Sequence, residues 1–145
     1  MDDQTSLPSG VAIRPDPIVT MDSKAFWDGA NRGELIVQQC AKCETLHHPP
    51  RPMCPKCHAV TMRGAKMSGA GKVYSWCVPV HPPAFGFASP PIVALIDLAE
   101  GPRILSNVVG IEPQEMTNGL KVQVEFAPTA GGNQVPVFRA KTKGR

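Results

Sequence analysis

The sequence lacks any apolar run long enough to cross a membrane. Its longest one, residues 90–96, is far short of the ~18 residues that a spanning helix needs, and its length suits a strand. The first residues, Met1 to Gln4, have neither the basic start nor the apolar stretch of a secretory signal. We therefore expect a soluble, cytoplasmic protein that has no membrane partner.

Aromatic and charged residues are also scarce. Aromatic side chains make up 6% of the chain and charged ones 19%, and the net charge is only +3. A protein that binds single-stranded nucleic acid needs a basic groove interleaved with aromatic stacking platforms. The barrel that the sequence predicts carries acidic Asp97, Glu100 and Glu125 instead. This composition argues against nucleic acid as the partner.

The motifs of a self-sufficient enzyme are missing as well. The sequence contains no nucleophile motif and no glycine-rich phosphate-binding loop. We therefore predict that this chain carries no catalytic residues of its own.

Turn-forming residues, in contrast, are abundant. The 145 residues include 16 prolines and 13 glycines, which implies many turns and few long helices. A chain of this length holds one ordinary domain or two small ones. The composition predicts a mainly β protein.

Four of the five cysteines form two Cys-x-x-Cys pairs, Cys40/Cys43 and Cys54/Cys57, with ten residues between the pairs. Each pair can close a tight knuckle that directs two sulfurs to one point, so two knuckles supply four thiolates for a tetrahedral Zn²⁺ ion. The Pro-rich residues between the pairs cannot form a helix and must loop. Two disulfides are the competing interpretation, which the missing secretory signal disfavours.

A zinc ion held by four thiolates has no open position for water or substrate. Such an ion should stabilise folding and take no part in catalysis. Three nearby histidines could replace a cysteine as ligand, but four sulfurs already complete the site, so we interpret them as bystanders: His47, His48 and His58.

The chain before and around the cysteines divides into an arm, a helix and a ribbon. Residues 1–21 contain four prolines or glycines without any period and predict an extended arm. A helix is predicted over residues 24–31, with a cap at Asp22-Ser23 and a stop at Gly33. A strand over residues 35–37 then leads into Cys40, and we assign residues 22–68 to the helix and zinc ribbon together.

The second half of the chain has the period of two that is typical of strands. Five strands with a short helical insertion at residues 112–116 match the layout of an OB-fold barrel, which we place at residues 69–140. Tyr74 and Trp76 fall on the apolar face of the first strand and are predicted to lie in the core. Residues 141–145 form a basic tail. The five strands are predicted at residues 73–80, 92–98, 104–109, 121–126 and 135–138.

The order of these features resembles a known family. Residues 23–139 are similar to the rubredoxin-like zinc-ribbon and acyl-CoA-associated OB-fold family in their helix, their Cys-x-x-Cys ribbon and their barrel. The barrel residues that carry the resemblance are Gly71-Lys-Val-Tyr-Ser-Trp76, the Pro-rich loop after them, Ile92-Val-Ala-Leu-Ile-Asp-Leu-Ala-Glu-Gly-Pro-Arg103 and Val135-Pro-Val-Phe138.

The resemblance implies an accessory role. Members of this family are small partners of thiolases and thiolase-like aldolases, or are fused to dehydratase-like domains, in acyl-CoA and steroid side-chain pathways. It implies a non-catalytic subunit that binds an acyl-CoA and forms a heteromer. In this heteromer two copies of the chain bind a dimer of a thiolase-like subunit. The resemblance also allows a dehydratase-like subunit as the partner. The alternative is a zinc-ribbon and OB-fold protein that binds single-stranded nucleic acid, because both folds occur in such proteins.

The chain departs from the family at two positions. Members commonly have Gly directly after each cysteine pair, whereas this chain has Glu44 and His58. If the knuckles keep their geometry, both residues must adopt a positive φ, which is unfavourable for residues that have a Cβ.

A coenzyme A thioester presents phosphates, an adenine and a long arm, so its site needs cations, an aromatic face and an apolar groove. Phe85 and Phe87 lie in the loop between the first two barrel strands, where OB folds bind ligands, but they could equally plug the barrel end or serve a protein interface. Arg103, Arg139 and Lys141 are candidate phosphate partners; the alternative for each is an exposed cation without a partner.

Overall fold

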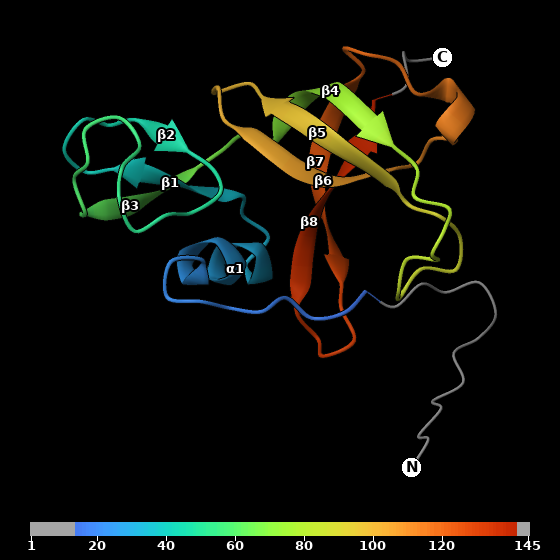
Figure 1. Ribbon diagram of the computed structural model, residues 1–145, viewed down its shortest axis with the longest axis horizontal. Coiled ribbons are helices and arrows are strands. Elements are labelled where there is room, and N and C mark those ends of the chain that lie inside the picture. The colour runs from blue at the N-terminus through green and yellow to red at the C-terminus, as the bar shows by residue number, and fades with distance from the viewer. Residues whose placement is uncertain (1–13, 142–145) are drawn as a thin grey trace.

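The computed structural model describes residues 14–141 and has two lobes, a small helix–ribbon lobe and a β-barrel (Figure 1). The first 13 residues of the predicted arm and residues 142–145 of the predicted tail lie outside the described part. Among residues 14–141, no helix is long and apolar enough to cross a membrane.

The single α-helix of the described residues, α1, spans Lys24–Asn31 and confirms the predicted segment. It follows Ser23 and ends before Gly33, whose φ of +78° suits a residue without a side chain. Its buried face contains Phe26 and packs onto the first strand so closely that a Cβ at Gly29 would lie 2.4 Å from Ile36 Cγ1. Any residue larger than glycine at position 29 would therefore displace Ile36.

The ribbon is a three-stranded antiparallel sheet of β1 (Ile36–Cys40), β2 (Leu46–His47) and β3 (Met62–Lys66), with β1 in the middle. The sequence predicted the central strand but neither of its neighbours. Both lie in stretches without a regular apolar alternation, so their pairing with β1 depends on the knuckles that bring them back to it.

The second lobe is the predicted five-stranded closed barrel, with strand order β4-β5-β6-β8-β7 (Figure 1). A 3₁₀ turn, η1 (Pro113–Glu115), interrupts the strands between β6 and β7, where the sequence predicted a helical insertion. The inward residues of β5 alternate strictly, with Ile96 and Leu98 fully buried. The strands are β4 (Ala70–Cys77), β5 (Ile92–Leu98), β6 (Arg103–Val109), β7 (Lys121–Pro128) and β8 (Gln134–Ala140).

The core prediction for Tyr74 is wrong. The pairing of β4 with β5 shifts between Val73 and Ser75, so Tyr74 is an extra residue at a bulge. Val73 and Trp76 consequently face or pack against the core, while Tyr74 is 51% exposed. A single inserted residue reverses the faces on either side of it, which strict alternation in the sequence does not reveal.

The barrel closes through a short parallel seam between β6 and β8. Only Val108 with Phe138 and Val109 with Arg139 pair across it. On the side that faces the ribbon lobe the two strands have no ladder, and the Ser106 hydroxyl donates a hydrogen bond of 2.9 Å to the carbonyl of Pro136. The seam is therefore partly open toward the ribbon lobe.

The described part of the arm binds the turn between β7 and β8. The Ala130 N–H donates to the Arg14 carbonyl at 2.9 Å, and the carboxylate of Asp16 accepts hydrogen bonds from Asn133 (2.9 Å) and from the Thr129 hydroxyl. These two hydrogen bonds hold the pKa of Asp16 below its usual value. Asn31, at the end of α1, also contacts this turn through Asn133, so helix and arm connect the two lobes at one place.

Candidate functional site

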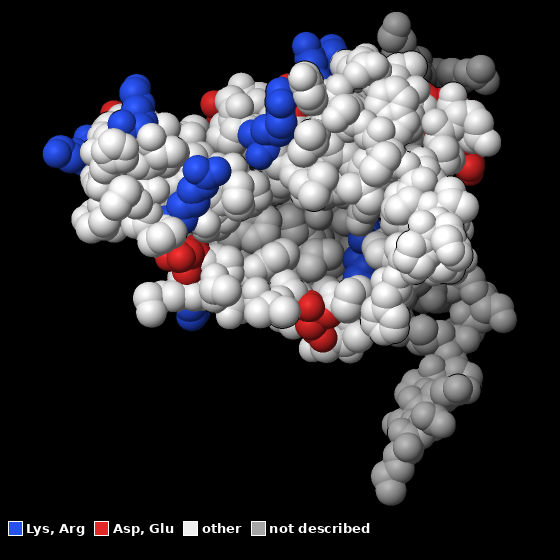
Figure 2. Space-filling view, viewed as in Figure 1, with Lys and Arg blue, Asp and Glu red and all other residues white. Residues whose placement is uncertain are grey.

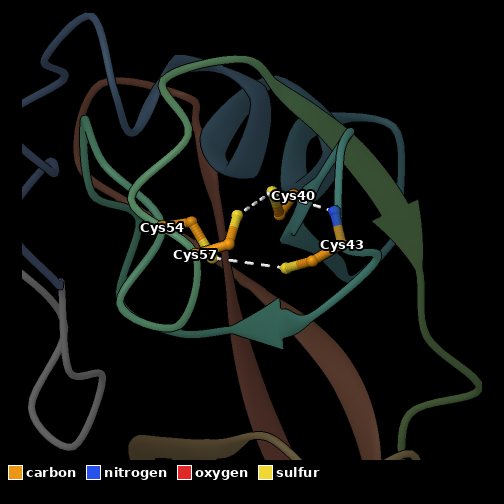
Figure 3. Close-up of side chains that lie close together, drawn as sticks. All are labelled: Cys40, Cys43, Cys54 and Cys57. Carbon is orange, nitrogen blue, oxygen red and sulfur yellow. Dashed lines mark hydrogen bonds between the residues drawn. The ribbon is translucent and has the colours of Figure 1, made fainter.

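The four paired cysteines converge in the ribbon. Cys40 ends β1, and all four sulfur atoms lie within 4.8 Å of one another (Figure 3). The Cys40 and Cys57 sulfurs are 3.5 Å apart, and the Cys43 and Cys54 sulfurs 3.6 Å. A tetrahedral zinc with Zn–S bonds of about 2.3 Å requires sulfur separations of about 3.8 Å, whereas a disulfide requires about 2.05 Å. The arrangement fits a four-sulfur metal site and excludes two disulfides in this structure.

Backbone N–H groups in both knuckles point at the sulfurs. Lys42 and Cys43 donate to the Cys40 sulfur at 3.4 and 3.5 Å, and Lys56 donates to the Cys54 sulfur at 3.4 Å. The bond from the Cys43 N–H lowers the pKa of Cys40, and the hydrogen bond to the Thr45 hydroxyl lowers the pKa of Cys43 to about 6. The thiolate is the form that binds metal, so the Cys40 and Cys43 thiols stand in for thiolates that their knuckle stabilises. In the second knuckle, burial and the neighbouring cysteine thiols raise the pKa of Cys57 to about 11.

The residues that replace glycine have the expected strained conformation. Glu44 has φ of +63° and His58 has φ of +65°. Their N–H groups close the knuckles by donating to the carbonyls of Cys40 and Cys54, at 3.0 Å each. The knuckle geometry is therefore kept without glycine.

The histidines near the ribbon stay apart from the sulfur cluster. Within residues 14–141, only the four cysteines form a group that could hold a metal. His48 packs against the Phe26 ring at 5.2 Å, and burial lowers its pKa to about 4. His47 is buried on β2, and burial lowers its pKa too. Both side chains are neutral at physiological pH and pack inside the lobe.

A cleft of about 500 Å³ lies between the two lobes, over the open seam of the barrel. Figure 2 shows it as a hollow with mostly uncharged walls and charged side chains around its rim. Two apolar side chains of its lining are largely exposed, Ile18 at 88% and Leu105 at 64%. The cleft is lined by the arm (Arg14, Ile18), α1 (Trp27), the loop after β2 (His48, Pro49, Pro50), β6 (residues 104–107) and β8 (Val135, Pro136).

Arg14 lies at the end of the cleft and was not predicted as a site residue. Its guanidinium donates to Asn107 Oδ1 at 2.6 Å and stacks over the Phe87 ring, 5.0 Å from its centroid. Burial lowers its pKa. It has no carboxylate partner among the described residues. The arm carries no periodic signal in the sequence, so only its docking on the barrel reveals this position.

The two loop phenylalanines have different environments. Phe85 is 85% exposed, whereas Phe87 is half-buried beneath Arg14. Phe87 thus links the loop to the arm, and Phe85 remains available for a ligand or partner.

The three predicted cations also differ. Arg103 pairs with Asp97 at 2.6 Å and stacks on Tyr74 at 3.6 Å, and Arg139 pairs with Glu125 at 2.7 Å. These hydrogen bonds raise the pKa of both arginines. Lys141, in contrast, forms no ion pair with any described residue.

The five predicted coenzyme A residues do not meet at one place. Lys141 lies beside Lys72 near the start of β4, whereas the phenylalanine loop follows the end of that strand at Cys77. Five residues of strand separate the two positions by roughly 16 Å.

Two family models match the chain in the order of its lobes. The model described as "ChsH2, rubredoxin-like zinc ribbon domain" matches residues 27–62, and "ChsH2, C-terminal OB-fold domain" matches residues 65–127. The chain belongs to the ChsH2 (DUF35) family. It is 39% identical over 95 residues to a DUF35 domain-containing scaffold protein of Methanocaldococcus jannaschii. The aligned region covers 63% of this chain and 67% of that protein.

Two relatives are longer than this chain and match it over only part of their length. The chain is 38% identical over 128 residues, 88% of its length, to a probable enoyl-CoA hydratase alpha subunit of Thermomonospora curvata. It is 33% identical over 125 residues, 82% of its length, to the 3-oxo-4,17-pregnadiene-20-carboxyl-CoA hydratase alpha subunit of Mycobacterium tuberculosis. It spans 40% of the length of each of these two relatives.

Solved structures of the ChsH2 (DUF35) family share the fold. A chain of the Ltp2-ChsH2(DUF35) aldolase is 37% identical, with a TM-score of 0.81 over 86% of this chain and 98% of that one. A DUF35 protein of unknown function from Sulfolobus solfataricus is 20% identical, with a TM-score of 0.57 over 86% of this chain and 87% of that one, and shows the fold alone.

Proposed function

We propose that this chain is a non-catalytic, acyl-CoA-binding accessory subunit of a thiolase or thiolase-like aldolase complex in lipid or steroid side-chain degradation. The observation that carries the proposal is its similarity to a chain of the Ltp2-ChsH2(DUF35) aldolase, which it covers over 98% of that chain's length. A cytoplasmic location belongs to the proposal, because five cysteines without a disulfide suit a reducing compartment.

The cleft between the lobes is the surface for the thiolase-like subunit. Exposed apolar side chains that are surrounded by polar ones are typical of protein interfaces, and Ile18 and Leu105 are of this kind. The arm and α1 form one wall and the barrel the other, so a partner in the cleft would contact both lobes. A dehydratase-like subunit is the second partner class that this surface could serve.

In this proposal the metal has a structural role. Cys40, Cys43, Cys54 and Cys57 hold one Zn²⁺ ion, and a site of four thiolates leaves no position for a substrate. The partner therefore supplies the nucleophile or base. This subunit contributes part of the wall that positions the thioester, and positioning can contribute on the order of several kcal/mol to the barrier.

We propose fewer coenzyme A contacts than the sequence predicted. Phe85 is free to contact the pantetheine arm, and Phe87 holds Arg14 in place. Arg103 and Arg139 would have to leave their carboxylate partners to bind phosphate, so Lys141 is the favoured cation of the predicted three.

Coexpression with a thiolase-like subunit encoded beside it is expected to give a stable complex with two copies of each chain. The apolar cleft requires a partner surface, and a partner dimer presents that surface twice. Native mass spectrometry of the copurified material measures the composition. If the chain stays monomeric beside every thiolase-like candidate, the proposal fails.

Substituting Phe85 with Ala in that complex is expected to lower kcat/KM for the coenzyme A thioester about tenfold, equivalent to about 1.4 kcal/mol. The reason is that the substitution removes an exposed aromatic ring and, with it, the contact that the ring makes with the ligand or the partner. Steady-state kinetics measure the effect, and Phe85→Leu, which keeps an apolar contact, should lose less. Unchanged kinetics in an intact complex would remove this loop from the site.

A further inference from the structure

A row of charged side chains runs across four strands of the barrel and the residue that follows the fifth, but it was only partly visible in the sequence. Asp97 of β5 pairs in register with Arg103 of β6 on one side and with Lys72 of β4 on the other. Lys72 pairs with Lys121 of β7. Lys141 follows β8 directly, and its N–H donates to the Lys121 carbonyl at 2.8 Å. Residues that lie opposite each other in a sheet share a face, so these five form one row.

The row lies on the outer face of the barrel. Its three lysines are exposed, while their strand neighbours Val73 and Val122 are buried. Four positive charges and one negative charge therefore face solvent along one line. Figure 2 shows Lys and Arg side chains along the upper edge of the barrel lobe.

The lysines of this row lack a counter-charge. Asp97 is already engaged by Arg103, with hydrogen bonds of 2.6 and 3.3 Å. Within the described residues, none of Lys72, Lys121 and Lys141 forms an ion pair. Like charges directly opposite each other, with Cβ atoms roughly 5 Å apart, destabilise a sheet. A bound anion would remove this repulsion.

The lysines also surround a pocket of about 430 Å³. Besides the lysines, it is lined by Asp97, whose carboxylate is engaged by Arg103, and by four apolar residues: Ala70, Gly71, Leu98 and Ala99. The pocket thus combines an apolar lining with three lysines that form no ion pair with a described residue and with one carboxylate that Arg103 already pairs.

We propose that this lysine pocket binds the phosphates of a nucleotide and that its apolar lining contacts the base. Lysine binds phosphate as a point charge, and an apolar lining suits an aromatic ring. Coenzyme A and free adenine nucleotides share this chemistry. If the ligand is coenzyme A, the inference rests on the proposed function and locates its nucleotide end at Lys72, Lys121 and Lys141.

Calorimetric titration of the zinc-loaded full chain with ADP, coenzyme A, inorganic phosphate and a thymidine oligonucleotide tests the proposal. ADP and coenzyme A are expected to bind at low salt and to bind more weakly as salt rises. Lys121→Gln should weaken both at least about tenfold. Lys66→Gln is the matched control, since it removes the same charge from an exposed strand position outside the pocket and should change nothing.

Each outcome decides one point. Coenzyme A binding more tightly than ADP supports the coenzyme as the ligand, and equal affinities support nucleotides in general. The proposal is overturned if no nucleotide binds, if both variants lose affinity equally, if inorganic phosphate binds as tightly as ADP, or if the oligonucleotide binds more tightly than either nucleotide. The isolated chain is measured here, so the result is independent of whether a thiolase-like subunit copurifies.

Discussion

Replacement of Cys54 with Ala is expected to unfold the helix–ribbon lobe and to leave the purified protein without its zinc ion. Cys54 is fully buried and supplies one of only four sulfur ligands. Structural zinc contributes about 10–16 kcal/mol to the folding of small zinc domains. The lobe has few other buried apolar residues, with Phe26, Leu35 and Val37 the largest, so it cannot compensate for the loss.

Metal analysis and circular dichroism measure this result. The wild type should contain about one equivalent of zinc and the variant almost none, because the tetrahedral site needs all four sulfur ligands. Cys77→Ala is the matched control, since this cysteine is exposed on β4 and lies outside the cluster. A strong chelator should reproduce the effect of Cys54→Ala. A Cys54→Ala protein with a full equivalent of zinc and an unchanged melting curve would contradict the metal assignment.

Replacement of Leu105 with Glu is expected to weaken association with the thiolase-like subunit at least a hundredfold, equivalent to about 2.7 kcal/mol. Leu105 projects into the cleft from β6 and is 64% exposed, so the barrel should tolerate the change. In a complex the new carboxylate would be buried without a partner, which is among the most costly changes at an interface.

Analytical ultracentrifugation of the coexpressed pair measures the loss of association. Val60→Glu is the control, because Val60 is equally apolar and 71% exposed but lies in the ribbon, away from the cleft. Thermal unfolding should be similar for both variants. Wild-type affinity in Leu105→Glu would show that the partner binds elsewhere.

Local signals in the sequence predicted much of the fold. The segment 92–98 is the same in the prediction and in β5, because a short apolar run of this length suits a buried strand. The helix at residues 24–31 ends before Gly33, and this glycine adopts the left-handed conformation that commonly follows a helix. The metal cluster follows from spacing alone, since two Cys-x-x-Cys pairs converge whatever connects them.

Features that depend on register or docking were not predictable in the same way. The Tyr74 bulge adds one residue to a strand and leaves no composition signal. The partners of Arg103 and Arg139 lie on neighbouring strands, so their pairing appears only when the register is known. Arg14 becomes a cleft residue only because Asp16 fixes the arm to a turn more than a hundred residues away in sequence.

The open seam between β6 and β8 affects how this subunit behaves before it meets a partner. Unpaired strand edges commonly recruit edges from other molecules and lead to aggregation. Here Pro136 has no N–H to offer, and its carbonyl is already bonded to the Ser106 hydroxyl. The seam therefore presents an interrupted template to a second copy of the chain. A subunit with such an edge can remain dispersed at high concentration while its apolar cleft is still empty.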